Sequence, residues 1–350
     1  MRTISRLILS AVFALLTVIL AAVAIYLPDV FFPAYTDLSR SVLSFLASVT
    51  GAFPFAGWEI LLVLRVLVVL FFLFHNKKPV QWLTGVLLLV VVLVFSFTAL
   101  WGLNHFAPPL ADRVGLEVRD SSKEELQATA QYMADQASYW ADQVPRDESG
   151  NMAVDFKDLA SMASHGYEAL ARQNSFFDGA DVAPVKKLAS SRLFSYMGLT
   201  GIFIAWTGEC NVNAETYAAS LPFTMCHEMA HRLTVAPEDE ANFCAFLACK
   251  ENPDPRFQYS GWYSAFVYAY NSLHRVDKDA AAQVWNSTSE TLRADCRRSN
   301  EHYQQFEGQV QEAANKANDA YLKVFQEESG VQSYGEVADL LIAWYLQNIG

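Results

Sequence analysis

Two histidines and a glutamate in one short segment are the residues of this sequence best suited to metal chemistry. His227 and His231 are four residues apart in an HExxH motif, so in a helix both imidazoles project from one face and could share a tetrahedral ion. Glu228 could reach a metal-bound water without being a ligand. The motif therefore predicts a Zn2+ site with Glu228 as the general base. The alternative is a solvated helix face that carries these residues by coincidence, because HExxH fixes only three positions.

A third protein ligand is expected soon after the motif. Pro237 suits the first turn of a new helix, so the chain would turn there and a second helix would fold back against the first. Glu238, at the start of that helix, is the preferred third ligand, and Asn242, one turn later, would support a ligand. Glu240 is the competing candidate. For both glutamates the alternative is a structural role, since carboxylates are favoured at helix N-termini.

Catalysis at such a site also needs a donor for the charge that develops on the attacked oxygen. Tyr259 and His274, on the next expected helix, are the preferred catalytic candidates, and aromatic packing in a helical core is their alternative role. Asn211 and Asn213 follow a β-rich stretch and could orient a substrate backbone along an edge strand. Three further histidines are in unrelated polar surroundings and are interpreted as surface residues: His105, His165 and His302.

All of these candidates lie in residues 104–350, which are predicted to form a mostly helical domain. Serines at 121–122 before glutamates at 124–125 form a capping-box pattern that begins a helix. Residues 201–206, followed by 210–213, predict the one small β-sheet. Helices are expected over residues 121–144, 156–173, 300–328 and 334–348, and from about residue 221 through the metal motif. The expected fold class is therefore mainly α.

Residues 1–103 are predicted to be a membrane domain. Apolar runs long enough to cross a hydrocarbon core of about 30 Å occur three times. They cover about residues 7–27, 57–74 and 82–103. Glu59 and Arg65 in the second run are interpreted as a carboxylate at the water boundary and a cation that snorkels or finds a partner. The sequence therefore predicts three N-terminal transmembrane helices.

Basic residues set the expected orientation. Arg2 and Arg6 precede the first span and two lysines at 77–78 separate the second from the third, so the positive-inside rule places both on the cytoplasmic side. Three crossings then place the domain 104–350 outside the cytoplasm. The alternative for the first run is a signal peptide cleaved near residues 22–24, which leaves the domain on the same side.

Composition limits the expected partners. Of the net charge of −12, residues 1–102 contribute +3 and the rest of the chain −15. An acidic domain disfavours nucleic acid, whose phosphates need a basic face. The expected partners are the lipid bilayer and a peptide or protein substrate. The five cysteines contain no CxxC pair, and Cys226 is interpreted as a small core residue. Residues 28–55 should include a helix lying on the membrane or on the domain.

Two resemblances support a metallopeptidase. The pattern Glu238-x-x-Ala241-Asn242 resembles the third-ligand helix of gluzincin metallopeptidases, where Glu is followed four residues later by Asp or Asn. The chain also resembles a bacterial family of polytopic membrane proteins catalogued as domain of unknown function thirty-eight ten. The resembling segments are 54–59, 207–213, 221–231, 238–243, 259–261, 321–323 and 330–335. The resemblance implies a zincin-like peptidase site with no established substrate. The family pattern has Gly where this chain has Thr234.

The sequence as a whole predicts a multi-pass zinc metallohydrolase of the bacterial cytoplasmic membrane, with its catalytic domain extracytoplasmic and a peptidase as the preferred activity. One alternative is a membrane-anchored binding or scaffold protein with a vestigial or structural zinc site. The polar helix expected at residues 300–328 would suit such a partner surface. Another alternative is a zinc amidase acting on a non-peptide cell-envelope substrate, because the metal chemistry is shared.

Overall fold

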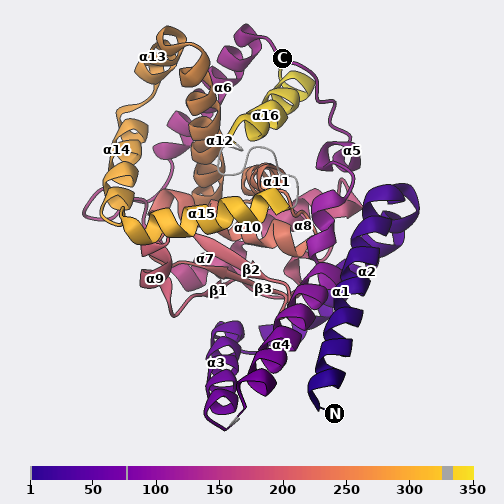
Figure 1. The fold of residues 1–350 in the computed structure, drawn as a ribbon. Helices are drawn as coiled ribbons and strands as arrows, with labels where there is room; N and C mark the ends of the chain where they lie inside the picture. The colour runs from indigo at the N-terminus through magenta and orange to yellow at the C-terminus, as the bar shows by residue number, and fades with distance from the viewer. Residues whose placement is uncertain (1, 76–77, 325–333) are drawn as a thin grey trace.

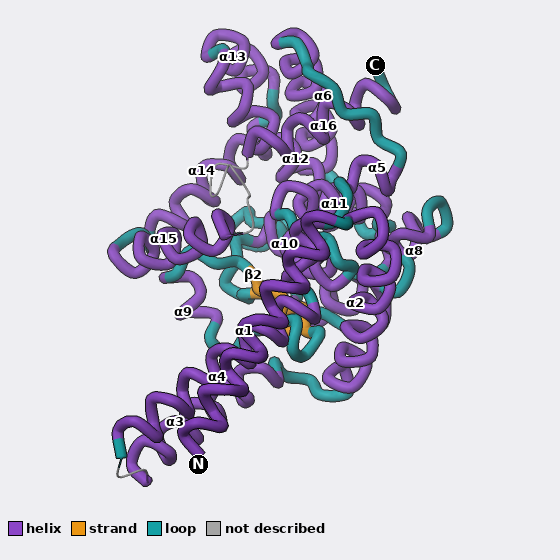
Figure 2. The backbone as a smooth tube through the Cα atoms, turned by 45° about the vertical axis from the view of Figure 1, so that its right-hand side comes forward, coloured by secondary structure: helices purple, strands orange, loops and turns teal. Residues whose placement is uncertain are grey.

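The chain is mainly helical and contains one small sheet. A computed structural model describes residues 2–75, 78–324 and 334–350. Figures 1 and 2 show long N-terminal helices that project from a larger helical body, which holds the sheet. The expected fold class, mainly α with a small sheet, is confirmed.

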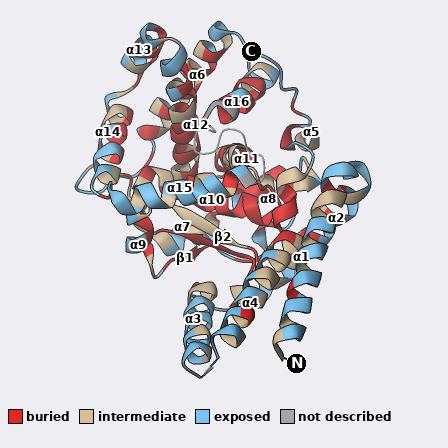
Figure 3. Cartoon of the chain, viewed as in Figure 1, coloured by how far each residue is buried: buried red, intermediate tan, exposed pale blue. Residues whose placement is uncertain are grey.

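Two of the projecting helices have the character of membrane spans. α1 (Arg2–Tyr26) and α4 (Pro79–Leu100) pack along one another, and much of their outer surface is exposed (Figure 3). Among the described residues, Thr3–Tyr26 and Pro79–Leu100 are the two helices long and apolar enough to cross a membrane. These helices correspond to the first and third expected spans.

The second expected span forms α3 (Gly57–His75), which is not one of these two helices. With 19 residues it is the shortest of the three, and it carries two charged side chains that contact the body. The Glu59 carboxylate accepts a hydrogen bond from the Ser190 N–H at 2.9 Å. The Arg65 guanidinium lies over the Trp206 ring, 5.6 Å from its centroid. The described residues therefore give two candidate spans, where three were expected.

α2 (Pro28–Gly51) is the helix expected between the first two spans, and it lies against the body. Its buried stripe consists of Phe32, Tyr35, Ser39, Leu43 and Ala47. The Ser39 hydroxyl donates to the Leu100 carbonyl at 2.7 Å, which ties α2 to the end of α4. The opposite side carries exposed apolar residues, among them Leu38 and Phe45. α2 therefore presents one face to the protein and an apolar face away from it.

The sheet lies beneath the metal motif. Its strands are β1 (Lys186–Lys187), β2 (Gly201–Ile204) and β3 (Glu209–Val212). Their order is β1-β3-β2, with β1 parallel and β2 antiparallel to β3, so β2 is an edge strand. The expected sheet is confirmed, but Asn211 lies in the central strand and donates to the Ile202 carbonyl. Asn213 donates to the Ser195 hydroxyl. Both side chains are used inside the body rather than along the edge.

The rest of the body is helical. Its α-helices are α5 (Leu110–Val114), α6 (Lys123–Ala141), α7 (Phe156–Met162), α8 (His165–Ala171), α9 (Ser191–Tyr196), α10 (Leu221–Arg232), α11 (Glu238–Glu251), α12 (Pro255–Val276), α13 (Lys278–Ser287), α14 (Glu290–Gln304), α15 (Gln309–Val324) and α16 (Tyr334–Asn348). Short 3₁₀ helices are η1 (Gly102–Phe106), η2 (Ser175–Phe177), η3 (Ala180–Val182) and η4 (Ala218–Ser220). α10, α11 and α12 pack together and form much of the buried core (Figure 3).

Two expected helices are divided in the structure, so their prediction as continuous helices was wrong. Residues 156–173 form α7 and α8, separated by a turn at 163–164. Residues 300–328 fall on α14 and α15, with a break at Gly308, whose φ of 156° is disfavoured for other residues. Residues 325–328 lie outside the described chain. The capping box of Ser122 and Glu125 at the start of α6 is confirmed, and α16 covers residues 334–348 as expected. All five cysteines are buried and free.

Candidate metal centre

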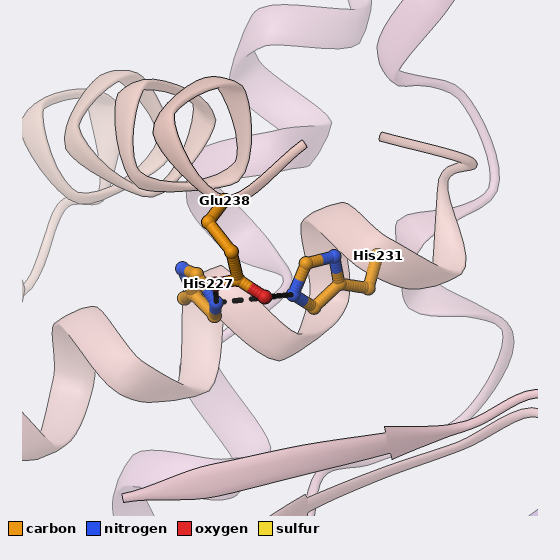
Figure 4. Close-up of side chains that lie close together, drawn as sticks. All are labelled: His227, His231 and Glu238. Atoms are coloured by element: carbon orange, nitrogen blue, oxygen red, sulfur yellow. Dashed lines mark hydrogen bonds and ion pairs between the residues drawn. The ribbon is translucent and has the colours of Figure 1, made fainter. Parts of the chain in front are cut away.

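α10 and α11 bring the HExxH motif and Glu238 together. His227 and His231 project from α10, and Glu238 is the first residue of α11, so the short connection between the helices turns its carboxylate toward both imidazoles (Figure 4). One ligand atom of each residue lies within 4.8 Å of the others. In the described ranges this is the one cluster of three His, Cys, Asp or Glu residues arranged to hold a metal ion.

The three ligand groups are close enough to share one zinc ion, with both Glu238 oxygens near the imidazoles. The two histidine Nε2 atoms are 3.1 Å apart, His227 Nε2 lies 3.2 Å from Glu238 Oε2, and His231 Nε2 lies 3.7 Å from Glu238 Oε1. Zinc bonds of about 2.0–2.1 Å give a tetrahedral edge of about 3.3 Å. Two imidazoles and a carboxylate also form a donor set of catalytic zinc sites, which leave the fourth position to water. These residues therefore fit Zn2+.

The turn after α10 orients His231. The Val235 N–H donates to the Ala230 carbonyl at 3.1 Å, and Thr234 has a φ of 69°, as in a Schellman motif. The Val235 carbonyl accepts a hydrogen bond from His231 Nδ1 at 2.8 Å, which leaves the Nε2 lone pair for a metal. Thr234 is the one non-glycine residue of the described chain with a positive φ. This conformation explains why glycine suits the position.

Glu228 is buried beside the cluster without being part of it. Its side chain lies against the edge strand, because a Cβ added to Gly201 would be 2.3 Å from Glu228 Oε1. Its other oxygen, Oε2, is buried and has no hydrogen-bond partner. Burial raises the pKa of Glu228 to about 8. An unpartnered buried carboxyl is costly for a folded protein, and such groups are typical of functional sites.

Two of the three candidate ligands, His231 and Glu238, have the protonation states that metal binding requires. Burial lowers the pKa of His231 to about 4. Burial also acts to lower the pKa of His227, but the adjoining Glu238 carboxylate outweighs it and raises that pKa. Burial would raise the pKa of Glu238, but its hydrogen bond to His227 and the nearby His231 lower it to about 2. Glu238 is therefore anionic and His231 neutral near pH 7.

The structure separates the two candidates for the third ligand. The Glu240 carboxylate points away from the histidines and accepts a hydrogen bond from the Leu110 N–H at 2.7 Å, at the start of α5. The Glu240 carboxylate is buried beside Arg113. Burial lowers the pKa of Arg113, and the charge of Glu240 partly offsets this effect. Glu238, rather than Glu240, stands next to His227 and His231.

Among the described residues, neither Tyr259 nor His274 has a hydrogen bond or ring contact with the candidate metal ligands. The Tyr259 hydroxyl is buried and donates to Asp295 Oδ2 at 2.5 Å. His274 is exposed near the end of α12 and stacks on Tyr270, with the ring centroids 5.9 Å apart. Their contacts connect α12 to itself and to α14, so their catalytic roles stay predictions without a supporting contact.

His105 was expected at the surface, but it lies beside the metal cluster. Its ring and that of His231 contact the same indole, with centroids 5.2 and 5.8 Å from that of Trp101. Burial lowers the pKa of His105 to about 4. His105 Nε2 is 3.0 Å from the hydroxyl of Tyr321, which α15 brings in from far along the chain. This pair lies at the site and was missed in the sequence. The available signals were the proximity of His105 to the end of a predicted span and the place of Tyr321 in the resembling segment 321–323.

The two other histidines lie elsewhere. His165 is exposed at the start of α8, as expected. His302 is half-buried on α14, and its Nε2 lies 2.7 Å from the Glu215 carbonyl.

Comparison with known proteins gives one match. A family model described as a protein of unknown function, DUF3810, matches residues 35–342. The matched range extends from α2 into α16 and contains the three ligand residues, Glu228 and the His105–Tyr321 pair. No curated protein and no solved structure matches the chain.

Proposed function

Because the chain belongs to the DUF3810 family of proteins of unknown function, its activity has to be inferred from its site, and we propose that it is a membrane-anchored zinc metallohydrolase acting as a peptidase. One observation carries this proposal. The two histidine Nε2 atoms are 3.1 Å apart and each lies within 3.7 Å of a Glu238 oxygen, and beside them stands Glu228, a buried carboxyl with an unpartnered oxygen.

Each residue of the site has a role in this proposal. His227, His231 and Glu238 would hold the ion, which when bound supplies Lewis-acid chemistry and an acidified water. Glu228 would take the proton of the attacking water. A cation held by the three ligands would lower the raised pKa of Glu228 toward the range of a general base at neutral pH.

His105 and Tyr321 are the better placed donors for the developing oxyanion. They lie beside Trp101, whose indole ring contacts both His105 and His231. A neutral imidazole N–H and a phenol O–H can both donate a hydrogen bond to an oxyanion. We assign this role to the pair in place of Tyr259 and His274.

The edge strand supports a peptide as the substrate. One side of β2 pairs with β3, and its other side is an edge that can pair with an extended chain. β2 begins at Gly201, directly beside Glu228. A backbone paired with β2 would therefore bring a peptide bond close to the general base.

The packing of α1 and α4 supports three membrane crossings. Arg6 donates to the Gln81 carbonyl at 2.5 Å near the start of both helices, and Ala24 packs with Leu103 near their ends. The two helices are therefore parallel, so the chain has to cross back between them. α3 is the helix available, at about 1.5 Å per residue and so about 28 Å long. We propose three spans, with the domain 104–350 outside the bacterial cytoplasmic membrane.

Metal analysis of the full chain in detergent or nanodiscs tests this proposal. Stoichiometric zinc is expected near pH 7. Glu228→Gln should keep the zinc and abolish cleavage, which comparative proteomics of membranes would show as fragments that vanish. Glu238→Gln should weaken zinc binding by more than about 100-fold, because even partners outside the ligand shell cost 10–100-fold.

Glu240→Gln is the matched control for the third ligand. It should keep zinc and lower thermal stability, since it disturbs the hydrogen bond to the Leu110 N–H. A purified chain without zinc at near-neutral pH would refute the proposed function.

A further inference from the structure

The metal cluster lies directly on the end of a proposed membrane span. Trp101 is the first residue after α4, and its indole N–H donates to the His231 carbonyl at 3.0 Å. Ser39 of α2 caps the Leu100 carbonyl at the same level. The exposed apolar face of α2, with Leu38 and Phe45, also suits the surface of a bilayer. The cluster is therefore at the boundary between membrane and water.

β2 leads from the general base toward the membrane. Gly201, its first residue, contacts Glu228, and the chain continues through Ile204 to Trp206. The Trp206 indole N–H donates to the Ser96 hydroxyl of α4 at 3.0 Å. Ser96 precedes the end of α4 by four residues, or about 6 Å of helix. The turn after β2 therefore reaches, through the Trp206 side chain, about one helical turn below the boundary that Trp101 marks.

An apolar pocket lies at that lower end of β2. It has a volume of about 130 Å³ and lies between one face of α3 and the turn after β2. Its walls include Trp58, Leu61, Leu62 and Arg65 of α3 together with Ile204 and Trp206. The Trp58 indole N–H is buried without a hydrogen-bond partner. The pocket thus offers mainly apolar walls, which suit an apolar segment.

α15 covers one side of the site. α15 crosses in front of α10 in Figure 1, and its Tyr321 reaches His105 beside the cluster. Tyr321 also contacts Phe97 near the end of α4, with ring centroids 6.3 Å apart. α15 therefore forms a wall of the site beside His105 and Phe97.

We propose that the substrate is a polypeptide anchored in the membrane and cut just outside its anchor. Its segment next to the anchor lies in the pocket between α3 and β2, and its backbone pairs with β2 up to Glu228. β2 runs from the base toward the membrane, so an antiparallel partner runs from the membrane toward the base. The anchor is therefore on the N-terminal side of the scissile bond. This inference rests on the proposed peptidase function.

The test uses the full chain with zinc in lipid nanodiscs and one randomised, internally quenched peptide pool in three forms. One form carries a polyleucine transmembrane segment at its N-terminus, one carries it at its C-terminus, and one has no anchor. The N-terminally anchored pool should be cleaved at least ten times faster than the other two. Equal rates, or a preference for the C-terminal anchor, would overturn the inference.

Variants of α3 test the pocket itself. Leu62→Trp fills it and should remove the preference for the anchored pool. The control Val63→Trp changes the next residue, which is exposed and not part of the pocket wall, and should leave the preference intact. Equal effects of both substitutions would argue against the pocket.

A binding measurement separates this inference from the proposed function. A photo-crosslinking phenylalanine analogue at position 62 in Glu228→Gln protein should capture the N-terminally anchored pool and not the free pool. Crosslinks to phospholipid alone would overturn the inference, because the pocket would then hold lipid. Anchored-pool crosslinks without any Glu228-dependent cleavage would support the substrate site and refute the peptidase.

Discussion

Gly201 and Glu228 are in such close contact that a methyl group on the glycine would lie 2.3 Å from the carboxylate oxygen Oε1. The edge strand therefore approaches the expected general base as closely as a backbone without a side chain can. The same contact sets how closely β2 packs against α10. Any side chain at position 201 would therefore force the Glu228 carboxylate to move.

Gly201→Ala should displace the Glu228 carboxylate and lower kcat/KM by roughly 100-fold, as expected for a catalytic group moved by about 1 Å. Zinc content should stay stoichiometric, since the ligands come from α10 and α11. The measurement is peptide hydrolysis together with metal analysis of the same preparation.

Adding Glu228→Asp to Gly201→Ala provides the control. The shorter side chain removes the closest contact, at 2.3 Å to Oε1, and leaves that to Cγ at 2.8 Å, so the double variant should lose less activity than the two single effects combined. Full activity of Gly201→Ala, or loss of its zinc, would contradict the contact as described.

Thr234 predicts a stabilising substitution. Its φ of 69° is strained for a β-branched residue, at a cost of roughly 1–2 kcal/mol. Thr234→Gly removes this strain but gives the unfolded chain more freedom. We expect a net gain of about 1 kcal/mol, which corresponds to about 2–4 °C in Tm. Thr288 has a φ of −70° at the end of α13, so Thr288→Gly should lower Tm. A lower Tm for Thr234→Gly in calorimetry would rule out strain at this turn.

The raised pKa of Glu228 predicts how the stability of the metal-free protein depends on pH. Burial moves this pKa from its ordinary 4.5 to about 8, so the folded state binds a proton that the unfolded state releases between these values. Stability is therefore lost as pH rises from about 4.5 to about 8. Glu228→Gln lacks the titration and should gain in Tm over wild type across this window.

Scans in chelator from pH 4 to 9 would measure this difference. Exposed Glu124, at the start of α6, is the control, and Glu124→Gln should run parallel to wild type across the window. If Glu228→Gln also ran parallel to wild type, the carboxyl would not be protonated in the folded metal-free chain.

The ligand residues could be predicted because their geometry is local. His227 and His231 share one helix, and Pro237 places Glu238 at the start of the next. The sequence favoured Glu238 but left Glu240 open, since the position of Glu240 depends on the Leu110 N–H, which is brought near by α5. The HExxH motif thus defines two candidate ligands, and packing brings the third candidate beside them.

Features that depend on strand order or distant helices could not be predicted. The residues near Asn211 were expected at an edge, but β1 pairs beside β3 and leaves β2 as the edge strand. His105 and Tyr321 are 216 residues apart and meet only because η1 and α15 converge. No periodicity or motif relates such positions, and for this reason Tyr259 and His274 seemed the better donors.

Tyr321→Phe tests the donors that the structure favours. It removes the hydroxyl that lies 3.0 Å from His105 Nε2 while keeping the ring against Phe97. Loss of one oxyanion donor typically lowers kcat by about 100–1,000-fold, and we expect a fall in this range with little change in KM or zinc content.

Tyr259→Phe is the contrasting variant. It breaks a buried hydrogen bond to Asp295, so it should cost about 1–3 kcal/mol of stability and leave kcat of the folded enzyme near wild type. If Tyr259→Phe lowered kcat and Tyr321→Phe lowered only stability, the donor would be on α12, and α15 would merely cover the site.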